Sequence, residues 1–453
     1  METIHFNRMK KHVLLIIWVL VAACQGKPGH IPVVDAALND TTSVFYTDFT
    51  TYPTLRNHLP IGVFDSGTGG LTVLEAILSS RLLEGEDFIY LADQANMPYG
   101  NYAAEGKTDF LRELIIKDAL FLLGHQVKIL VVACNTATAY GLEDITNFLE
   151  DSGSGIKAIG VINAGVKAAL DRIDPKEDVA VGVLATTGTI ASGGYENTFR
   201  SLAKERGYTG NLQIISHGAA GFAEAVDSEK DYVDPRALAP RGDYRGPSTD
   251  HPVYRIDTNL LAAYGFDFSA NHILYKGSKS RPRDLQLNST ENYARYHLLS
   301  LVEKLRKTKD PQPLRYLVLG CTHFPYQSGT LSRMLTELRE YEERGEYPYR
   351  DLIDEKVTLI DPAFETAREL YTTLVKDSLL TLKMGNTQAA FYISVPLEDA
   401  GRFSYAYKYG RDPGVFTEDV NIVPFSVQNI DSLTRERLRS LRFTWPLLPF
   451  GSE

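Results

Sequence analysis

Two cysteines that lie far apart in the chain occupy the same local context. Cys134 ends the apolar run 129–133 and precedes an asparagine and a threonine, and Cys321 ends the apolar run 316–320 and precedes a threonine and a histidine. Each run is typical of a buried β-strand that would deliver a thiol, and then polar groups, at its carboxyl end. Ligands of open α/β sheets bind at that end of the strands. Two thiols that arrive there from separate halves of the chain indicate one site with two reactive faces.

Alternating strand and helix patterns surround both cysteines. The chain has short apolar runs typical of buried strands at residues 61–64, 88–91, 129–133, 158–161, 179–184, 212–215 and 316–320. Most of these runs are followed by a loop and a helix-like pattern, and such β-loop-α repeats imply a parallel, doubly wound sheet. We therefore predict the α/β fold class, with two similar halves in a pseudo-twofold arrangement and a cleft between them.

Asp65 stands where the first of these strands ends and a glycine-rich loop, 66–70, begins. Glycines let a backbone turn tightly and approach a ligand closely, and the helix start that follows offers free N–H groups to an anion. The spacing matches neither a P-loop nor a dinucleotide-binding loop, so it does not imply a nucleotide. Taken alone, Asp65 could also be a helix N-cap.

Composition limits the class of protein. The 453 residues leave room for two domains of ordinary size plus extensions. With 44% hydrophobic and 23% charged residues, the chain has the composition of a globular protein. Its formal net charge of -10 argues against a nucleic-acid partner, which would require a basic face. Three cysteines are too few for a disulfide framework, and the ten histidines are scattered without metal-ligand spacing, so we expect no metal.

The N-terminus carries a pattern of its own. Basic residues precede the apolar run 13–23, as in a signal peptide, and the run ends in VAAC, which resembles a bacterial lipobox. This implies cleavage before Cys24, a diacylglyceryl group on its sulfur and a stable membrane anchor. The alternative is a buried cysteine in an ordinary helix, and either Met1 or Met9 could start the chain. We expect a lipid-anchored protein on the periplasmic side of the bacterial cell envelope, or a cytoplasmic protein if the lipobox is not used.

Five motifs, taken in order, resemble the glutamate racemase branch of the cofactor-independent aspartate/glutamate racemase family. They are IGVFDSGTGGLTV over 61–73, PYG over 98–100, ACNTA over 133–137, GTI with a following Tyr-Glu pair over 188–196, and LGCTHFP over 319–325. The resemblance runs from about residue 60 to residue 400. It implies two α/β domains that face each other across an active-site cleft, each contributing one catalytic cysteine.

The resemblance also suggests how the chain is divided. We expect a lipoprotein signal peptide, a tether, a first racemase domain in two parts, a second racemase domain and a C-terminal extension, over residues 1–23, 24–58, 59–157 plus 325–400, 158–324 and 401–453. The second domain carries an insertion, 231–289, that is rich in Pro, Arg, Asp and Tyr and shows little periodicity. A segment of that length could be a lid, a partner surface or a packed decoration.

The implied activity is the interconversion of L-glutamate and D-glutamate without a cofactor, linked to peptidoglycan and cell wall biosynthesis. Racemisation without pyridoxal phosphate requires a base on one face of Cα and an acid on the other, and two thiols can fill both roles. By the resemblance, Asp65 assists Cys134, His323 assists Cys321, and Glu224 falls where the family places a further assisting carboxylate. The resemblance assigns substrate binding to Asp65, Ser66, Tyr99, Gly100, Asn135, Thr136, Thr322 and His323.

Other interpretations stay open. Each cysteine could be a small buried hydrophobic residue, His323 and Tyr99 could be structural, and Glu224 could lie on a solvated helix face. Asn163 stands where the family usually has a glutamate, which leaves aspartate or another amino acid as an alternative substrate. The insertion leaves open a non-catalytic, lipid-anchored amino-acid-binding protein. A dithiol redox protein is disfavoured because no CxxC occurs and the thiols would lie too far apart to bridge. The oligomeric state is undecided, with a homodimer as one option.

Overall fold

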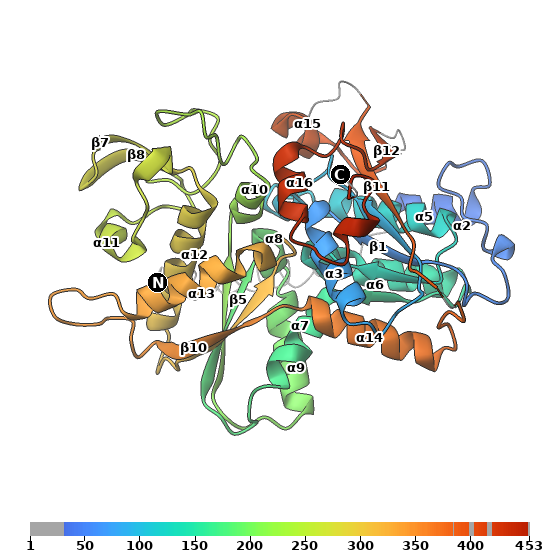
Figure 1. Ribbon diagram of the computed structural model, residues 1–453, viewed down its shortest axis with the longest axis horizontal. Helices are drawn as coiled ribbons and strands as arrows, with labels where there is room; N and C mark the ends of the chain where they lie inside the picture. The colour runs from blue at the N-terminus through green and yellow to red at the C-terminus, as the bar shows by residue number, and fades with distance from the viewer. Residues whose placement is uncertain (1–30, 384, 398–402, 415–418, 452–453) are drawn as a thin grey trace, which may run out of the picture.

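The computed structural model describes residues 31–383, 385–397, 403–414 and 419–451. The predicted signal peptide and Cys24 lie outside the described residues. Within the described residues, no helix is both long enough and apolar enough to cross a membrane. The molecule has two α/β lobes, drawn in Figure 1 mainly in blue, orange and red for the first and in green and yellow for the second.

The first lobe contains a sheet of six strands. Its strands are β1 (Ile61–Asp65), β2 (Phe88–Ala92), β3 (Ile129–Val132), β4 (Ala158–Gly160), β11 (Ala389–Pro396) and β12 (Val420–Pro424). They lie in the order β12-β11-β2-β1-β3-β4, and every neighbouring pair is parallel except β11 and β12. The strands β1, β2 and β3 are buried along their whole length, as expected for parallel strands covered on both faces.

The second lobe contains a sheet of four parallel strands. They are β5 (Val179–Ala185), β6 (Leu212–Gly218), β9 (Leu314–Gly320) and β10 (Ile353–Ile360), and they lie in the order β10-β9-β5-β6. A separate antiparallel pair is formed by β7 (Ile273–Ser278) and β8 (Arg281–Leu287). The prediction of an α/β fold with two parallel-sheet domains is confirmed.

Helices cover both faces of both sheets. The helices near the first sheet are α2 (Pro32–Asn39), α3 (Leu71–Ser79), α4 (Gly100–Ala104), α5 (Thr108–Gly124), α6 (Asn135–Asp151), α14 (Ala363–Lys376), α15 (Tyr405–Gly410) and α16 (Ser432–Leu438). Those near the second sheet are α7 (Val161–Leu170), α8 (Thr187–Ala191), α9 (Gly194–Glu205), α10 (Phe222–Val226), α11 (Leu261–Tyr264), α12 (Thr290–Arg306) and α13 (Ser328–Arg339). One core of the first lobe joins α3 and α14, and the other joins α2, α5 and α6. The second lobe has one core with α10, α12 and α13 and another with α7 and α9.

The stretch 31–58 differs from the predicted tether because it packs on the first lobe. Val33 and Ala37 of α2 are completely buried, and α2 contacts α5. The hydroxyl of Tyr52 donates to the backbone oxygen of Leu123 at 2.6 Å. The two buried residues of α2 stand four apart, so they share one helix face, but a single pair is too short a pattern to predict a helix from sequence.

The return of the chain to the first lobe also differs from the prediction, which placed it at residue 325. The strand β10 pairs with β9 in the second sheet, and α13 packs against α12. Conversely, β4 belongs to the first sheet. In the unit β9-α13-β10, strand β10 lies beside β9 in the second sheet, as is usual for consecutive parallel strands. The chain therefore returns to the first lobe at α14, which packs against α3.

The insertion and the C-terminal extension are both packed parts of the fold. Within 231–289, Ile256, Leu285 and Leu287 are buried in the same core as α12. The extension adds β12 to the edge of the first sheet and places α16 beside α10, where the two lobes meet (Figure 1). The extension therefore reaches the region between the lobes.

Candidate active site

A pocket with about 500 Å³ of empty space lies between the carboxyl ends of the two sheets. The first lobe contributes Ser66 after β1, the segment 97–101 after β2, and the segment 134–136 after β3. The second lobe contributes residues 186 and 187 after β5, residues between 219 and 224 after β6, and the segment 321–323 after β9. Six strand ends therefore form one site, as the strand-end argument predicted.

The pocket brings together most of the residues singled out from the sequence. It is lined by Ser66, Tyr99, Gly100, Cys134, Asn135, Thr136, Glu224, Cys321, Thr322 and His323. Asp65 lies behind this lining and is completely buried. The lining residues Asn101, Thr186 and Thr187 were missed; the threonines follow an apolar run as Cys134 does, which is the signal that could have identified them.

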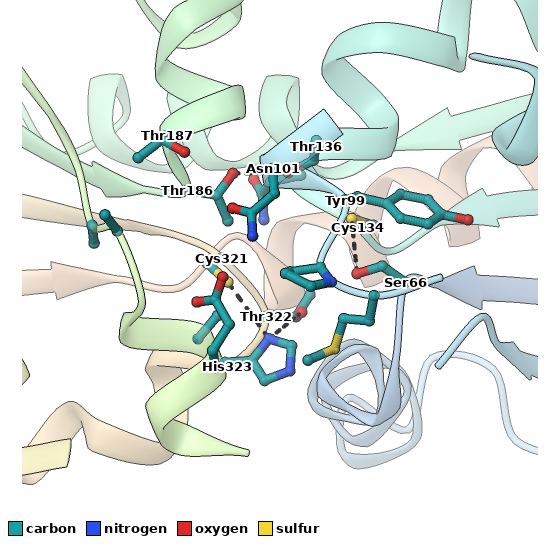
Figure 2. A pocket seen from close by; sticks show the side chains of 18 of the residues that line it. Ser66, Tyr99, Asn101, Cys134, Thr136, Thr186, Thr187, Cys321, Thr322 and His323 are labelled. Carbon is teal, nitrogen blue, oxygen red and sulfur yellow. Dashed lines mark hydrogen bonds between the residues drawn. The ribbon is translucent and has the colours of Figure 1, made fainter. Parts of the chain in front are cut away.

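Cys134 is held at the N-terminus of α6. It is the N-cap residue, and its Sγ accepts a hydrogen bond from the backbone N–H of Ala137 at 3.4 Å. Its thiol lies 3.6 Å from Oγ of Ser66 (Figure 2). A helix N-terminus favours negative charge nearby. Burial, however, raises the pKa of the Cys134 thiol, and the carboxyl group of Asp65 raises it further.

Asp65 anchors the glycine-rich loop beneath Cys134. Its Oδ2 accepts hydrogen bonds from the backbone N–H groups of Gly70 at 2.7 Å and Gly67 at 3.3 Å. Thr322, from the other lobe, donates its hydroxyl to the same oxygen at 3.3 Å. Burial raises the pKa of this carboxyl group, although the charge of His323 and the Gly70 N–H oppose the shift. Asp65 can therefore exchange a proton more readily than an ordinary, fully ionised aspartate.

Cys321 lies at the start of a chain of interacting side chains. Its Sγ is 3.6 Å from Nδ1 of His323, and Nε2 of His323 is 3.2 Å from Oδ2 of Asp227. Asp227 in turn forms an ion pair with Arg437. Burial opposes protonation of His323, but the charge and hydrogen bond of Asp227 outweigh it, and the pKa of His323 is raised well above its usual value. A cationic imidazole beside Cys321 stabilises a thiolate.

The carboxylate that contacts His323 is Asp227, which caps the C-terminus of α10 and was not singled out from the sequence. Glu224, predicted as a further assisting carboxylate, lines the pocket. The two residues are three positions apart and so lie on the same side of α10. Burial raises the pKa of Glu224 to about 7. Burial would also raise the pKa of Asp227, but Arg437 and His323 hold it well below the ordinary value.

Tyr99 lines the pocket, but its hydroxyl lies against two carboxylates outside the lining. The hydroxyl lies 2.6 Å from Oδ2 of Asp93 and 2.7 Å from Oδ2 of Asp118, and Figure 2 shows the ring directed away from Cys321. Tyr99 is 1% exposed. Its contribution to the pocket wall therefore comes from the part of the residue near the backbone, next to Gly100.

The polar groups beside Cys134 are fixed by contacts between the lobes. Tyr195 donates its hydroxyl to Oδ1 of Asn135 at 2.6 Å, which leaves the amide nitrogen of Asn135 as the free donor. The hydroxyl oxygens of Thr136, Thr186 and Thr189 lie 2.9 to 3.0 Å apart from one another. None of the described residues that line the pocket is a lysine or an arginine. An anionic ligand would therefore be held by hydroxyl, amide and backbone N–H donors.

Two facing sheets that each deliver a cysteine to one shared pocket form the arrangement that the resemblance to two-domain α/β amino-acid racemases implies. Comparison with known proteins narrows this class. A glutamate racemase from Oceanobacillus iheyensis is 29% identical over 314 residues, which are 69% of this chain and 78% of the relative. One from Methylococcus capsulatus is 29% identical over 346 residues, which are 76% of this chain and 90% of the relative. Both relatives are glutamate racemases, and this chain is similar to them over most of their length.

Two further comparisons are with solved structures and with protein-family models. A crystal structure of a glutamate racemase isoform from Bacillus anthracis aligns with a TM-score of 0.46 and 26% identity, covering 74% of this chain and 88% of that chain. No protein-family model matches the chain.

Proposed function

We propose that the protein interconverts L-glutamate and D-glutamate by two-base proton transfer between the substrate and two cysteines. The observation that carries this proposal is the approach of Cys134 and Cys321 to one pocket from two different sheets. One thiolate removes the α-proton from one face of the substrate while the opposite thiol donates a proton to the other face. The glutamate racemases from Oceanobacillus and Methylococcus support the choice of substrate, and the product would serve cell wall biosynthesis.

The two cysteines have different neighbours. Cys321 lies beside a histidine whose pKa is raised, and a cation is the kind of neighbour that activates a thiol. The thiol of Cys134 stays protonated, because burial and Asp65 raise its pKa. Each cysteine therefore has its own neighbouring proton-exchanging group, and the roles of base and acid would exchange between the cysteines when the opposite enantiomer is the substrate. Asp65 and His323 are the groups placed to accept or supply the proton.

The carbanionic transition state must be stabilised by the donors around the substrate carboxylates. The hydroxyl groups of Ser66, Thr136, Thr186 and Thr322 and the amide of Asn135 line the pocket. Such donors form charge-assisted hydrogen bonds with carboxylates, and donors fixed in advance need no reorganisation during the reaction. The contacts of Asn135 with Tyr195, and of Thr136 with Thr186, hold two of these groups in place.

A direct test is to incubate the purified protein with L-glutamate, without added cofactor, and to follow D-glutamate by chiral chromatography. The same assay with aspartate and other amino acids tests the alternative substrates. Asn163, which raised that alternative, is exposed on α7 and does not line the pocket. Glu224 places a carboxyl group in the pocket wall, and this observation still favours a substrate other than glutamate. Binding of an amino acid without any racemisation would support the non-catalytic alternative.

We propose in addition that the protein is anchored to the bacterial cell envelope through a lipid on Cys24. The support is the sequence pattern alone: a basic segment, the apolar run 13–23 and the VAAC motif. Labelling of growing cells with a radioactive fatty acid should mark the wild-type protein, and Cys24→Ala should lose the label. A label that persists in the variant would contradict the anchor.

Sedimentation of the purified protein would decide whether it forms a homodimer.

A further inference from the structure

The C-terminal extension reaches the active site although it lies beyond the part of the chain that resembles racemases. Its helix α16 starts at the N-cap Asp431, whose carboxylate accepts hydrogen bonds from the backbone N–H groups of Leu433 at 2.9 Å and Thr434 at 3.1 Å. Leu438 is completely buried in the core of the first lobe. These contacts fix the rotation of α16, so that the side chain of Arg437 faces inward and is 13% exposed.

The guanidinium of Arg437 joins the two lobes. On the second lobe it forms an ion pair with Asp227 and donates to the backbone oxygen of Val226 at 3.0 Å. On the first lobe it donates to Oγ1 of Thr68, in the glycine-rich loop, at 2.9 Å. It also lies over the ring of Tyr326, with Cζ 4.9 Å from the ring centroid. One side chain of the extension therefore contacts the loop that follows Asp65 and the carboxylate that contacts His323.

The contacts of Arg437 extend a row of buried groups that begins at Cys321. The order is the Cys321 sulfur, the His323 imidazole, the Asp227 carboxylate and the Arg437 guanidinium. Asp227 and His323 are 8% and 2% exposed, and a buried charge is costly unless it is paired. Without Arg437, the remaining row would carry a net negative charge whenever Cys321 is ionised, so the thiolate would be disfavoured relative to the thiol.

We propose that Arg437 is a positioning residue of the active site: it holds Asp227 against His323, and thereby favours the thiolate of Cys321, while it ties Thr68 of the opposite lobe to the same point. The extension is then a functional part of the enzyme as well as an addition to the first sheet. This inference rests on the proposed racemase function for its kinetic consequences only.

The test compares Arg437→Met with Arg439→Met in the full chain. Arg439 follows α16 directly, but its side chain is 58% exposed and pairs with Glu436, so its substitution controls for the loss of a cation from this segment. Alkylation by iodoacetamide, followed by mass spectrometry of the two cysteine peptides, measures the reactivity of Cys321 near neutral pH. Cys134 is the internal reference, since Asp65 and Ser66 lie beside it in place of His323.

We expect Arg437→Met to slow the alkylation of Cys321 by about tenfold while that of Cys134 stays within about twofold. The turnover number should fall by roughly 10- to 100-fold, and KM should change much less, because a misplaced acid–base group affects chemistry more than binding. Arg439→Met should match the parent protein. Arg437→Lys keeps the charge but loses the fork that reaches Thr68, and should lie between the parent and Arg437→Met.

Parent-like alkylation of Cys321 in Arg437→Met would overturn the inference, and so would a lowered melting temperature with unchanged turnover. Should the methionine variant not fold, Arg437→Lys decides the question: parent-like alkylation and turnover would overturn the inference. The alkylation rates do not depend on the identity of the substrate. A parent protein that fails to racemise glutamate would therefore count against the proposed function, while the effect on Cys321 would still decide the role of Arg437.

Discussion

Gly69 and His323 belong to different lobes, yet a Cβ added to Gly69 would lie 2.6 Å from Cε1 of His323 and 2.7 Å from its Nδ1. The same Cβ would meet Oγ1 of Thr322 at 2.7 Å. Such distances are too short for any side-chain carbon, so the glycine-rich loop approaches the histidine as closely as backbone can. The loop therefore shapes the surroundings of Cys321 as well as those of Cys134.

We predict that Gly69→Ala reduces racemase turnover by about 100-fold, because His323 or Thr322 must move away from its present position. The folded protein should lose roughly 1 to 3 kcal/mol of stability from overpacking. Gly329→Ala is the matched control, since Gly329 lies within α13 and a Cβ there would meet nothing within 4 Å. Turnover numbers and melting temperatures of both variants check the prediction, and a fully active Gly69→Ala enzyme would contradict the geometry of the site.

Asp227 and Glu224 should differ sharply when substituted. Asp227→Asn removes the carboxylate that contacts His323, and we expect turnover to fall by about 100-fold, as for the loss of an acid–base partner. Glu224→Gln should leave turnover within about fivefold, because this side chain makes no hydrogen bond to His323. Measurement of both turnover numbers shows which of the two carboxylates assists His323. The reverse ranking would restore Glu224 as the assisting carboxylate.

Glu224 should instead make substrate binding depend on pH. A carboxyl group with a pKa of about 7 is neutral below that pH and anionic above it. Because the described lining of the pocket has no lysine or arginine, ionised Glu224 would repel the carboxylates of glutamate, with only His323 to offset it, while Asp227 and Glu229 add negative charge. KM for glutamate should therefore rise above pH 7, by up to roughly tenfold per pH unit.

Removal of the ionisable group at position 224 should remove this pH dependence of KM. In Glu224→Gln, this rise of KM with pH should disappear, since the amide does not ionise. Glu224 is an acid whose pKa is raised by folding. Its ionised form therefore destabilises the folded protein at pH values above the pKa that the residue has in the unfolded chain. The melting temperature of Glu224→Gln should accordingly exceed that of the parent at alkaline pH. An unchanged KM profile would show that Glu224 does not sense the substrate.

Tyr99→Phe tests whether the tyrosine hydroxyl contacts the substrate. Because this hydroxyl lies against Asp93 and Asp118, its removal should cost about 1 to 3 kcal/mol of stability through the loss of a buried hydrogen bond to a carboxylate. KM should stay within about threefold. Tyr195→Phe is the informative comparison, since Tyr195 orients the amide of Asn135 in the pocket, and its KM should rise. A large rise of KM for Tyr99→Phe at unchanged stability would return its hydroxyl to the substrate.

The extent of these corrections shows what local sequence patterns can predict. Apolar runs that end in Cys134 and Cys321 predicted the sheets and the site, because parallel strands are buried on both faces and present their carboxyl ends at one edge. Ten of the predicted residues line the pocket. The side-chain direction of Tyr99 and the choice between Glu224 and Asp227 depend on helix rotation and on distant carboxylates, which no local pattern encodes. Arg437 could not be predicted because its partners, on α10 and in the glycine-rich loop, are distant from it in the sequence.

The most direct test of the two-cysteine account is the fate of the α-hydrogen in deuterated water. Starting from L-glutamate, the D-glutamate formed early should carry deuterium at Cα while the remaining L-glutamate stays unlabelled, because the proton removed by one thiol differs from that donated by the other. Cys134→Ser and Cys321→Ser should each abolish this conversion. D-glutamate that forms without deuterium, or a serine variant that racemises glutamate at the parent rate, would contradict the account.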